Sequence, residues 1–169
     1  VLTLMQDTNN IINQFLPISL AEMDRVKLMN RIDTKFAFRI GLLEELLDEL
    51  KAEYKVLEIN TIRIPKYESL YFDDAQFSFF QDHHKGKTNR FKVRIRKYVE
   101  SNIHFLEIKH KVKGRTDKRR ILTDNFNELT EEKEREFLKR QLADKTDLRP
   151  TMWNSFQRIT LVSKTSKER

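Results

Sequence analysis

The sequence contains no cysteine, which excludes disulfide bonds and thiolate metal sites. It has only three glycines, and neither a Gly-x-x-x-x-Gly-Lys loop nor a Gly-x-Gly-x-x-Gly run occurs, so a mononucleotide-binding α/β fold is disfavoured. A Gly-x-Ser-x-Gly nucleophile motif is also missing. No apolar run is long enough to cross a bilayer as a helix. The lack of cysteine is compatible with a reducing compartment, and we expect a cytoplasmic protein.

Positively charged residues outnumber negatively charged ones in this chain. It carries 33 Lys and Arg against 26 Asp and Glu, a formal net charge of +7, while 38% hydrophobic residues suffice for one core. Such a balance predicts an anionic partner, with nucleic acid, phosphorylated metabolites and anionic lipid headgroups as the candidates. We expect residues 1–169 to form a single domain, and we interpret the chain as C-terminally truncated because it stops at Arg169.

Three short runs, 91–98, 105–111 and 118–122, have the alternation of β-strands with one apolar face and one cationic face. The residues that alternation places on the cationic face are Lys92, Arg94 and Arg96 in the first run, Glu107, Lys109 and Lys111 in the second, and Lys118 and Arg120 in the third. The connection 113–117 suits a hairpin between the second and third runs. Like charges on neighbouring strands repel unless an anion lies between them, so this face is the candidate functional surface.

The remaining segments complete an α+β pattern. Helices are predicted from Leu42 to Leu50, within 74–85 and from an N-cap at Thr130, and a Ser19–Glu22 capping box predicts another helix start. Further strands or extended segments are predicted at 31–39, 54–64, 69–73 and 156–162. Curled together, such strands would form an antiparallel β-tunnel or barrel with a basic lumen and helices packed outside. The alternation alone equally allows a half-exposed sheet whose charged face meets water.

Two carboxylates lie among the cations. Asp33 stands between Arg31 and Lys35, and Glu107 stands two residues before Lys109. A carboxylate on a cationic face can hold Mg²⁺ or Mn²⁺ together with substrate phosphate oxygens, or it can simply pair with neighbouring bases. The sequence leaves both interpretations of Asp33 and Glu107 open.

Nucleic acid is a rival ligand because aromatic residues are interleaved with the basic strands. Alternation places Phe91 on the face opposite Arg94 and Arg96, and Tyr98 is the clearest aromatic residue on the cationic face of its strand. Single-strand stacking platforms need aromatics and cations together, so we predict that nucleic acid is not the partner.

An ordered set of short motifs extends along nearly the whole chain. They are Asn30-Arg31-Ile32-Asp33-Thr34-Lys35-Phe36, Leu70-Tyr71-Phe72-Asp73-Asp74, Arg94-Ile95-Arg96-Lys97-Tyr98, Leu106-Glu107-Ile108-Lys109, Lys118-Arg119-Arg120, Phe156-Gln157-Arg158 and Glu168-Arg169. In order and spacing they resemble the VTC domain, the polyphosphate polymerase module of the vacuolar transporter chaperone. That module belongs to the CYTH or triphosphate tunnel metalloenzyme superfamily.

The resemblance implies a tunnel that grips triphosphate or polyphosphate and a phosphotransferase that moves the terminal phosphoryl group of ATP onto polyphosphate with a divalent metal, Mn²⁺ or Mg²⁺. By position it implies phosphate-binding roles for Lys35, Arg94, Arg96, Lys109, Lys118, Arg158 and Arg169, with Lys111 and Arg120 as further lumen candidates. Asp33 and Glu107 are the candidate metal ligands. Cations that position and neutralise the phosphates suit phosphoryl transfer, which needs little covalent chemistry from the protein.

The chain also departs from the family pattern. The pattern continues past Glu168-Arg169 into further strands, including a glutamate strand associated with metal binding, so we expect an open tunnel and weakened metal binding here. Arg31-Ile32-Asp33-Thr34-Lys35 replaces the Glu-x-Glu-x-Lys signature of tunnel triphosphatases, which favours the polymerase branch. An inorganic triphosphatase, or a non-catalytic module that binds polyphosphate or inositol polyphosphate, remains the alternative.

Overall fold

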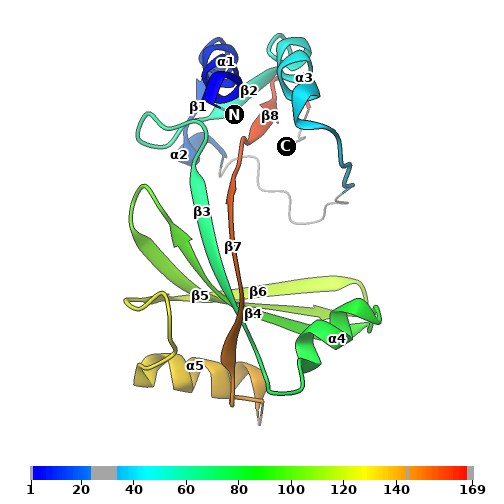
Figure 1. Ribbon diagram of the computed structural model, residues 1–169, viewed down its shortest axis with the longest axis vertical. Helices are drawn as coiled ribbons and strands as arrows, with labels where there is room; N and C mark the ends of the chain where they lie inside the picture. Colours follow the sequence, from blue (N-terminus) through cyan, green and yellow to red (C-terminus); the bar gives the residue numbers. More distant parts are fainter. Residues whose placement is uncertain (1, 24–33, 144, 167–169) are drawn as a thin grey trace. The chain divides into compact units, whose positions relative to one another are not determined.

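The computed structural model describes residues 2–23, 34–143 and 145–166 (Figure 1). The chain forms two compact units, one of Val1–Ile64 with Arg158–Arg169 and the other of Pro65–Gln157. The expectation of a single domain over residues 1–169 stays a prediction. Within the described ranges, every helix is too short or too polar to cross a membrane.

The unit of Pro65–Gln157 is built on a five-stranded antiparallel sheet with the order β6-β5-β4-β3-β7. Its strands are β3 (Lys66–Asp73), β4 (Asn89–Tyr98), β5 (Ile103–Val112), β6 (Arg115–Thr123) and β7 (Arg149–Gln157). The three predicted cationic strands and their hairpin are confirmed, and so is the α+β fold with antiparallel strands. The sheet is open, because β6 and β7 form its two edges.

One face of this sheet carries the hydrophobic core. The buried residues of this face in β4 (Val93 and Ile95) and in β5 (Leu106 and Ile108) stand two positions apart, as the alternation predicts, and α5 (Glu132–Leu142) covers this face below the sheet in Figure 1. The buried cluster comprises Phe72, Val93, Ile95, Leu106 and Ile108 from the strands, Phe79 from α4 (Ser78–His84), and Phe137, Leu138 and Leu142 from α5. The predicted N-cap at Thr130 is wrong by one residue. Glu131 caps α5 instead, because its side chain and that of Glu134 exchange hydrogen bonds with the backbone in a capping box.

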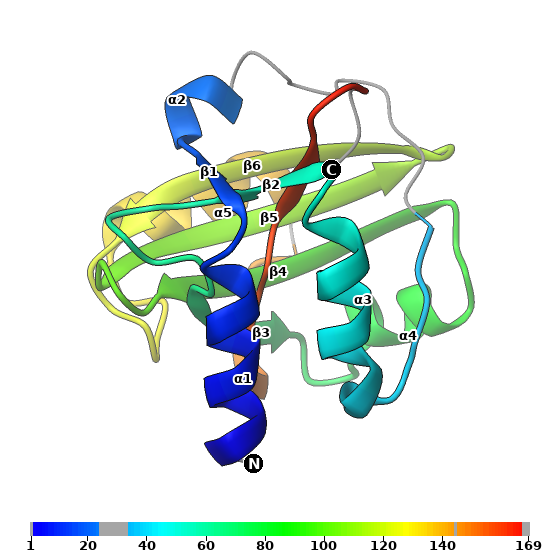
Figure 2. The same cartoon turned by 90° about the horizontal axis from the view of Figure 1, so that it is seen from above.

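The other unit contains two helices packed on each other and a three-stranded sheet. Its elements are α1 (Leu2–Ile12), β1 (Leu16–Ile18), α2 (Leu20–Met23), the 3-10 turn η2 (Ile40–Leu42), α3 (Leu43–Leu50), β2 (Tyr54–Leu57) and β8 (Leu161–Ser163). Helices α1 and α3 lie side by side in Figure 2, and Ile12, Phe15, Leu47 and Val56 form a buried cluster. The predicted Ser19–Glu22 capping box is confirmed, with the Glu22 N–H 3.3 Å from Ser19 Oγ.

Two predicted strands are wrong. Residues 34–39 form no strand, and Phe36 is 85% exposed; alternation in sequence cannot supply the neighbouring strand that a sheet needs. Residues 31–33 of that prediction lie outside the described residues. The predicted strand 156–162 is two strands, because Phe156 pairs with Tyr67 of β3 whereas Leu161 pairs with Val56 of β2.

Candidate functional site

Three lysines face one another across the neighbouring strands β4, β5 and β6. In the strand register Lys109 of β5 lies directly opposite both Lys92 of β4 and Lys118 of β6. Directly opposed side chains in antiparallel strands have their Cβ atoms about 5 Å apart, and like charges in that arrangement destabilise the sheet. We call Lys92, Lys109 and Lys118 the lysine row. Its repulsion is the strongest sign that this face accommodates an anion.

Next to the lysine row, a buried carboxylate balances part of the positive charge. Glu107 is 2% exposed, and its Oε2 accepts hydrogen bonds from Arg94 Nε at 2.8 Å and Arg94 Nη2 at 2.7 Å. Its Oε1 lies 2.6 Å from Lys118 Nζ, and Arg94 Nη1 also donates to the Tyr71 hydroxyl at 3.1 Å. A hollow of about 40 Å³ is lined by these four residues and by Lys92 and Lys109.

The charges on this face shift one another's pKa values. Burial alone would raise the pKa of Glu107, but the hydrogen bond from Lys118 and the charge of Arg94 outweigh it and lower that pKa below its usual value. Burial likewise opposes the charge of Arg94, yet Glu107 raises the pKa of Arg94. Burial and the neighbouring Arg94 cation lower the pKa of Arg96. An anion bound here would relieve that last penalty.

More aromatic rings lie on the cationic face than Tyr98, the one that the alternation identified there. The Arg96 guanidinium lies 5.6 Å from the ring centroid of Tyr67 and 5.4 Å from that of Phe156, and the Arg120 guanidinium lies 4.4 Å from that of Phe105. The prediction missed Tyr67 and Phe156 because they come from strands outside the three basic runs, whereas Phe105 lies within the second run and shares a face with Glu107 by the same alternation. These guanidinium–ring contacts are cation–π interactions within the cationic face.

The structure gathers most, but not all, of the predicted phosphate-binding residues. Those on the cationic face of the sheet are Arg94, Arg96, Lys109, Lys111, Lys118 and Arg120. Lys35 and Arg158 are exposed residues of the other unit, outside its strands. Arg169 and Asp33 lie outside the described residues. Lys92 was not among the predicted site residues, although the same alternation that selected Arg94 and Arg96 marks it.

Metal ligands are scarce on this face. Across β4, β5 and β6, Glu107 is the one carboxylate on the cationic face, and Arg94 and Lys118 already bind both of its oxygens. No cluster of three or more Asp, Glu, His or Cys residues is found in the described ranges. The described residues alone therefore do not fit a Mg²⁺ or Mn²⁺ site, and metal binding at Glu107 stays a prediction.

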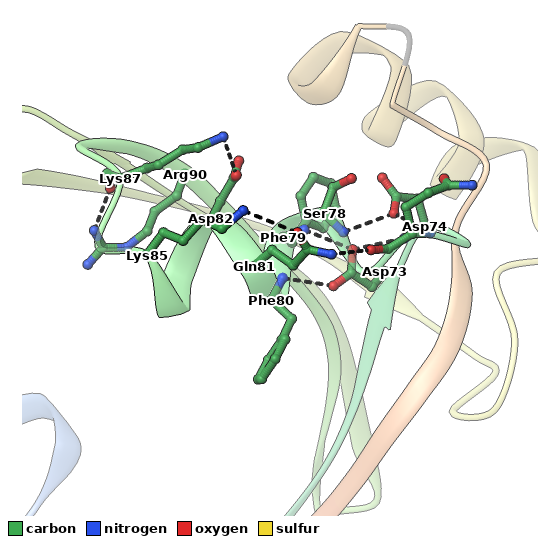
Figure 3. A network of polar contacts seen from close by, with 11 residues as sticks. Asp73, Asp74, Ser78, Phe79, Phe80, Gln81, Asp82, Lys85, Lys87 and Arg90 are labelled. Atoms are coloured by element: carbon green, nitrogen blue, oxygen red, sulfur yellow. Dashed lines mark hydrogen bonds and ion pairs between the residues drawn. The ribbon is translucent and has the colours of Figure 1, made fainter.

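A second polar network fixes the start of α4, beside the cationic face. Figure 3 shows the Asp73 carboxylate accepting hydrogen bonds at 2.9 Å from the backbone N–H groups of Phe79 and Phe80. Asp74 Oδ1 accepts from the N–H groups of Gln76 and Ser78 at 3.0 and 2.9 Å. The two carboxylates thus satisfy N–H donors that a helix start leaves without partners.

Comparison with known proteins gives a family match. The family model described as "VTC domain" matches residues 30–169, and the search of curated proteins gives no match. Among solved structures, an X-ray structure of a proposed adenylate cyclase from Vibrio parahaemolyticus is similar, with 11% identity and a TM-score of 0.40. The alignment covers 66% of this chain, which spans about half (51%) of that protein. Because the family match covers most of its length, the chain belongs to the VTC domain family.

Proposed function

We propose that the cationic face binds the phosphates of triphosphate or polyphosphate. The lysine row carries this proposal, because three cations at directly opposed positions are unfavourable in an empty sheet and favourable around a polyanion. Arg94, Arg96 and Arg120 extend the positive charge along the neighbouring positions of the same strands. Membership of the VTC domain family supports a linear phosphate chain as the ligand.

The reaction proposed for this ligand is phosphoryl transfer. The bond between the terminal phosphorus of a nucleoside triphosphate and its bridging oxygen breaks, and that phosphorus forms a bond to the terminal oxygen of a polyphosphate chain. The nucleoside diphosphate leaves with the bridging oxygen, and polyphosphate grows by one unit. The lysine row and Arg94 would hold donor and acceptor in line and stabilise the charge on the transferring group. Mn²⁺ or Mg²⁺ is proposed as an aid to phosphate binding.

A second candidate is a non-catalytic module that binds polyphosphate or inositol polyphosphate. It is favoured by Glu107, since the one carboxylate on the cationic face of β4–β6 is already tied to Arg94 and Lys118. A third candidate, hydrolysis of triphosphate, would use the same cations but water as the acceptor.

Binding and product analysis separate these candidates. Tripolyphosphate should bind the chain at moderate salt and displace a single-stranded oligonucleotide of equal charge; an oligonucleotide that outcompetes tripolyphosphate would overturn the proposed ligand. With ATP and Mn²⁺, polyphosphate would support the polymerase, orthophosphate without polymer would support the hydrolase, and tight binding without turnover would support the binding module.

A further inference from the structure

A pocket of about 330 Å³ lies beside α4 in the unit of Pro65–Gln157. Most of its wall is aromatic or apolar, with Phe77, Phe79 and Phe80 on one side and Met152 of β7 among the others. Phe79 is buried, whereas Phe77 is 45% and Phe80 64% exposed. Two large rings thus stand partly in solvent at the edge of a preformed hollow, an arrangement typical of ligand pockets.

The local backbone holds these rings in place. Phe77 has a φ of 55°, in the left-handed region that bulky side chains rarely adopt. The hydrogen bonds from the N–H groups of Ser78 and Phe80 to Asp74 and Asp73, drawn in Figure 3, hold the chain immediately after this strained residue. Arg149 reinforces the turn, because it donates to the Ala75 carbonyl at 3.1 Å and its guanidinium lies 5.8 Å from the Phe77 ring centroid. Strain maintained in this way is typical of functional positions.

The pocket adjoins the proposed phosphate site. Tyr71 and Lys92 line both this pocket and the small hollow between Arg94, Glu107 and the lysine row. Lys92 Nζ lies 3.3 Å from the His83 Nε2 of α4, so a cation stands at the junction of the two spaces. A ligand with phosphates on the lysine row could therefore place an attached apolar group directly in the pocket.

We propose that this pocket binds the base of a nucleoside triphosphate whose phosphates lie on the cationic face. The inference rests on the proposed function and adds to it a binding site for the base, the part of the substrate that the phosphate-binding residues do not contact. A base is flat and stacks on aromatic rings, which Phe77 and Phe80 offer, and it has polar edges that Thr151 and His83 in the pocket wall can meet. The cations beside the pocket favour a ligand that also carries phosphates over a purely apolar ligand.

The test compares two ligands that share phosphates but differ in the base. Dissociation constants of ATP and of tripolyphosphate are measured by calorimetry for the wild-type chain and for Phe77→Ala, Phe80→Ala and Phe80→Trp. Trp153→Ala is the matched control, since Trp153 is an exposed aromatic of β7 next to Met152 but does not line the pocket. Circular dichroism checks that each variant is folded.

We expect Phe77→Ala and Phe80→Ala each to weaken ATP binding roughly tenfold, the effect typical of losing one base-stacking ring, with tripolyphosphate binding unchanged. Phe80→Trp should keep the ATP affinity of the wild type, and the Trp153→Ala control should change the affinity for neither ligand. An unchanged ratio of the two dissociation constants in both alanine variants would overturn the base pocket while leaving the phosphate site standing. Failure of the wild-type chain to bind tripolyphosphate would instead overturn the proposed function, and this inference with it.

Discussion

Arg94 of β4 and Glu107 of β5 lie directly opposite each other and form a two-pronged ion pair, with both guanidinium contacts made to Glu107 Oε2. Lys118 holds the other oxygen of the same carboxylate. This arrangement gives Glu107 a structural task, namely balancing two cations in the middle of a basic face. It also makes Glu107 the residue whose replacement best separates charge balance from metal binding.

Glu107→Gln should lower the free energy of unfolding by about 2 kcal/mol, because the half-buried Arg94 loses its counter-charge, while the exposed Lys118 remains solvated by water. The same change should tighten tripolyphosphate binding in the absence of metal, since Arg94 and Lys118 are released to the ligand. Urea denaturation and calorimetry measure the two effects. Glu136→Gln on the exposed surface of α5 is the control for charge alone, and it should change both quantities little.

A metal role for Glu107 predicts a different result. If Glu107 binds Mn²⁺ or Mg²⁺, these ions should strengthen tripolyphosphate binding to the wild-type chain, and Glu107→Gln should abolish that effect. Equal metal dependence in both proteins would show that Glu107 is not a ligand.

The lowered pKa of Glu107 makes its contribution to stability dependent on pH. In the unfolded chain the carboxyl of Glu107 has its ordinary pKa of 4.5, and in the folded chain its pKa is lower. At a pH between these two pKa values the unfolded chain binds more protons than the folded chain. The stabilisation by Glu107 is therefore complete above pH 4.5 and is lost as the pH falls through the pKa of the folded state. The difference in unfolding free energy between the wild type and Glu107→Gln should therefore be constant near pH 7 and shrink below 4.5. A difference that grows on acidification would contradict the proposed ion pair.

Lys109→Ala tests the phosphate site and keeps all three residues of the ion pairs made by Glu107. Removing the central charge of the lysine row should lower tripolyphosphate affinity about tenfold, while the free energy of unfolding should stay within about 0.5 kcal/mol of the wild type, as is usual for an exposed side chain. Lys97→Ala is the matched control, because alternation places Lys97 on the opposite face of β4. The phosphate site would be wrong if both variants bound tripolyphosphate as the wild type does. Arg94→Ala is less informative, since it also leaves Glu107 buried without a partner.

Asp73→Ala should destabilise the start of α4. Asp73 is 4% exposed and accepts from three backbone N–H groups, those of Asp74, Phe79 and Phe80. Their loss should cost about 2 kcal/mol in urea denaturation. Asp117→Ala, which removes an exposed carboxylate paired with Arg119, should stay within about 0.5 kcal/mol of the wild type. Equal effects of the two substitutions would contradict the assigned role of Asp73.

The ordered VTC motifs marked the family, and local alternation marked the strands. Lys92, Arg94 and Arg96 could be assigned to one face before any partner strand was known, because the period of two is a property of the extended backbone itself. The leucines of α3 and the capping box at Ser19 were likewise readable, since both depend on residues within one or two turns. The sequence by itself therefore determined the cationic face, its apolar reverse side and the helix that follows Gly41.

Only the tertiary structure decided which charges face one another. The strand register places Lys109 between Lys92 and Lys118, and Arg94 opposite Glu107. The local sequence pattern does not specify which residues pair across strands. Tyr67 and Phe156 likewise contact Arg96 from strands that are distant in the sequence. Residues 34–39 alternate like a strand but pair with no other strand in the described structure. Periodicity fixes the face of a side chain, whereas its electrostatic surroundings depend on long-range contacts that no local pattern encodes.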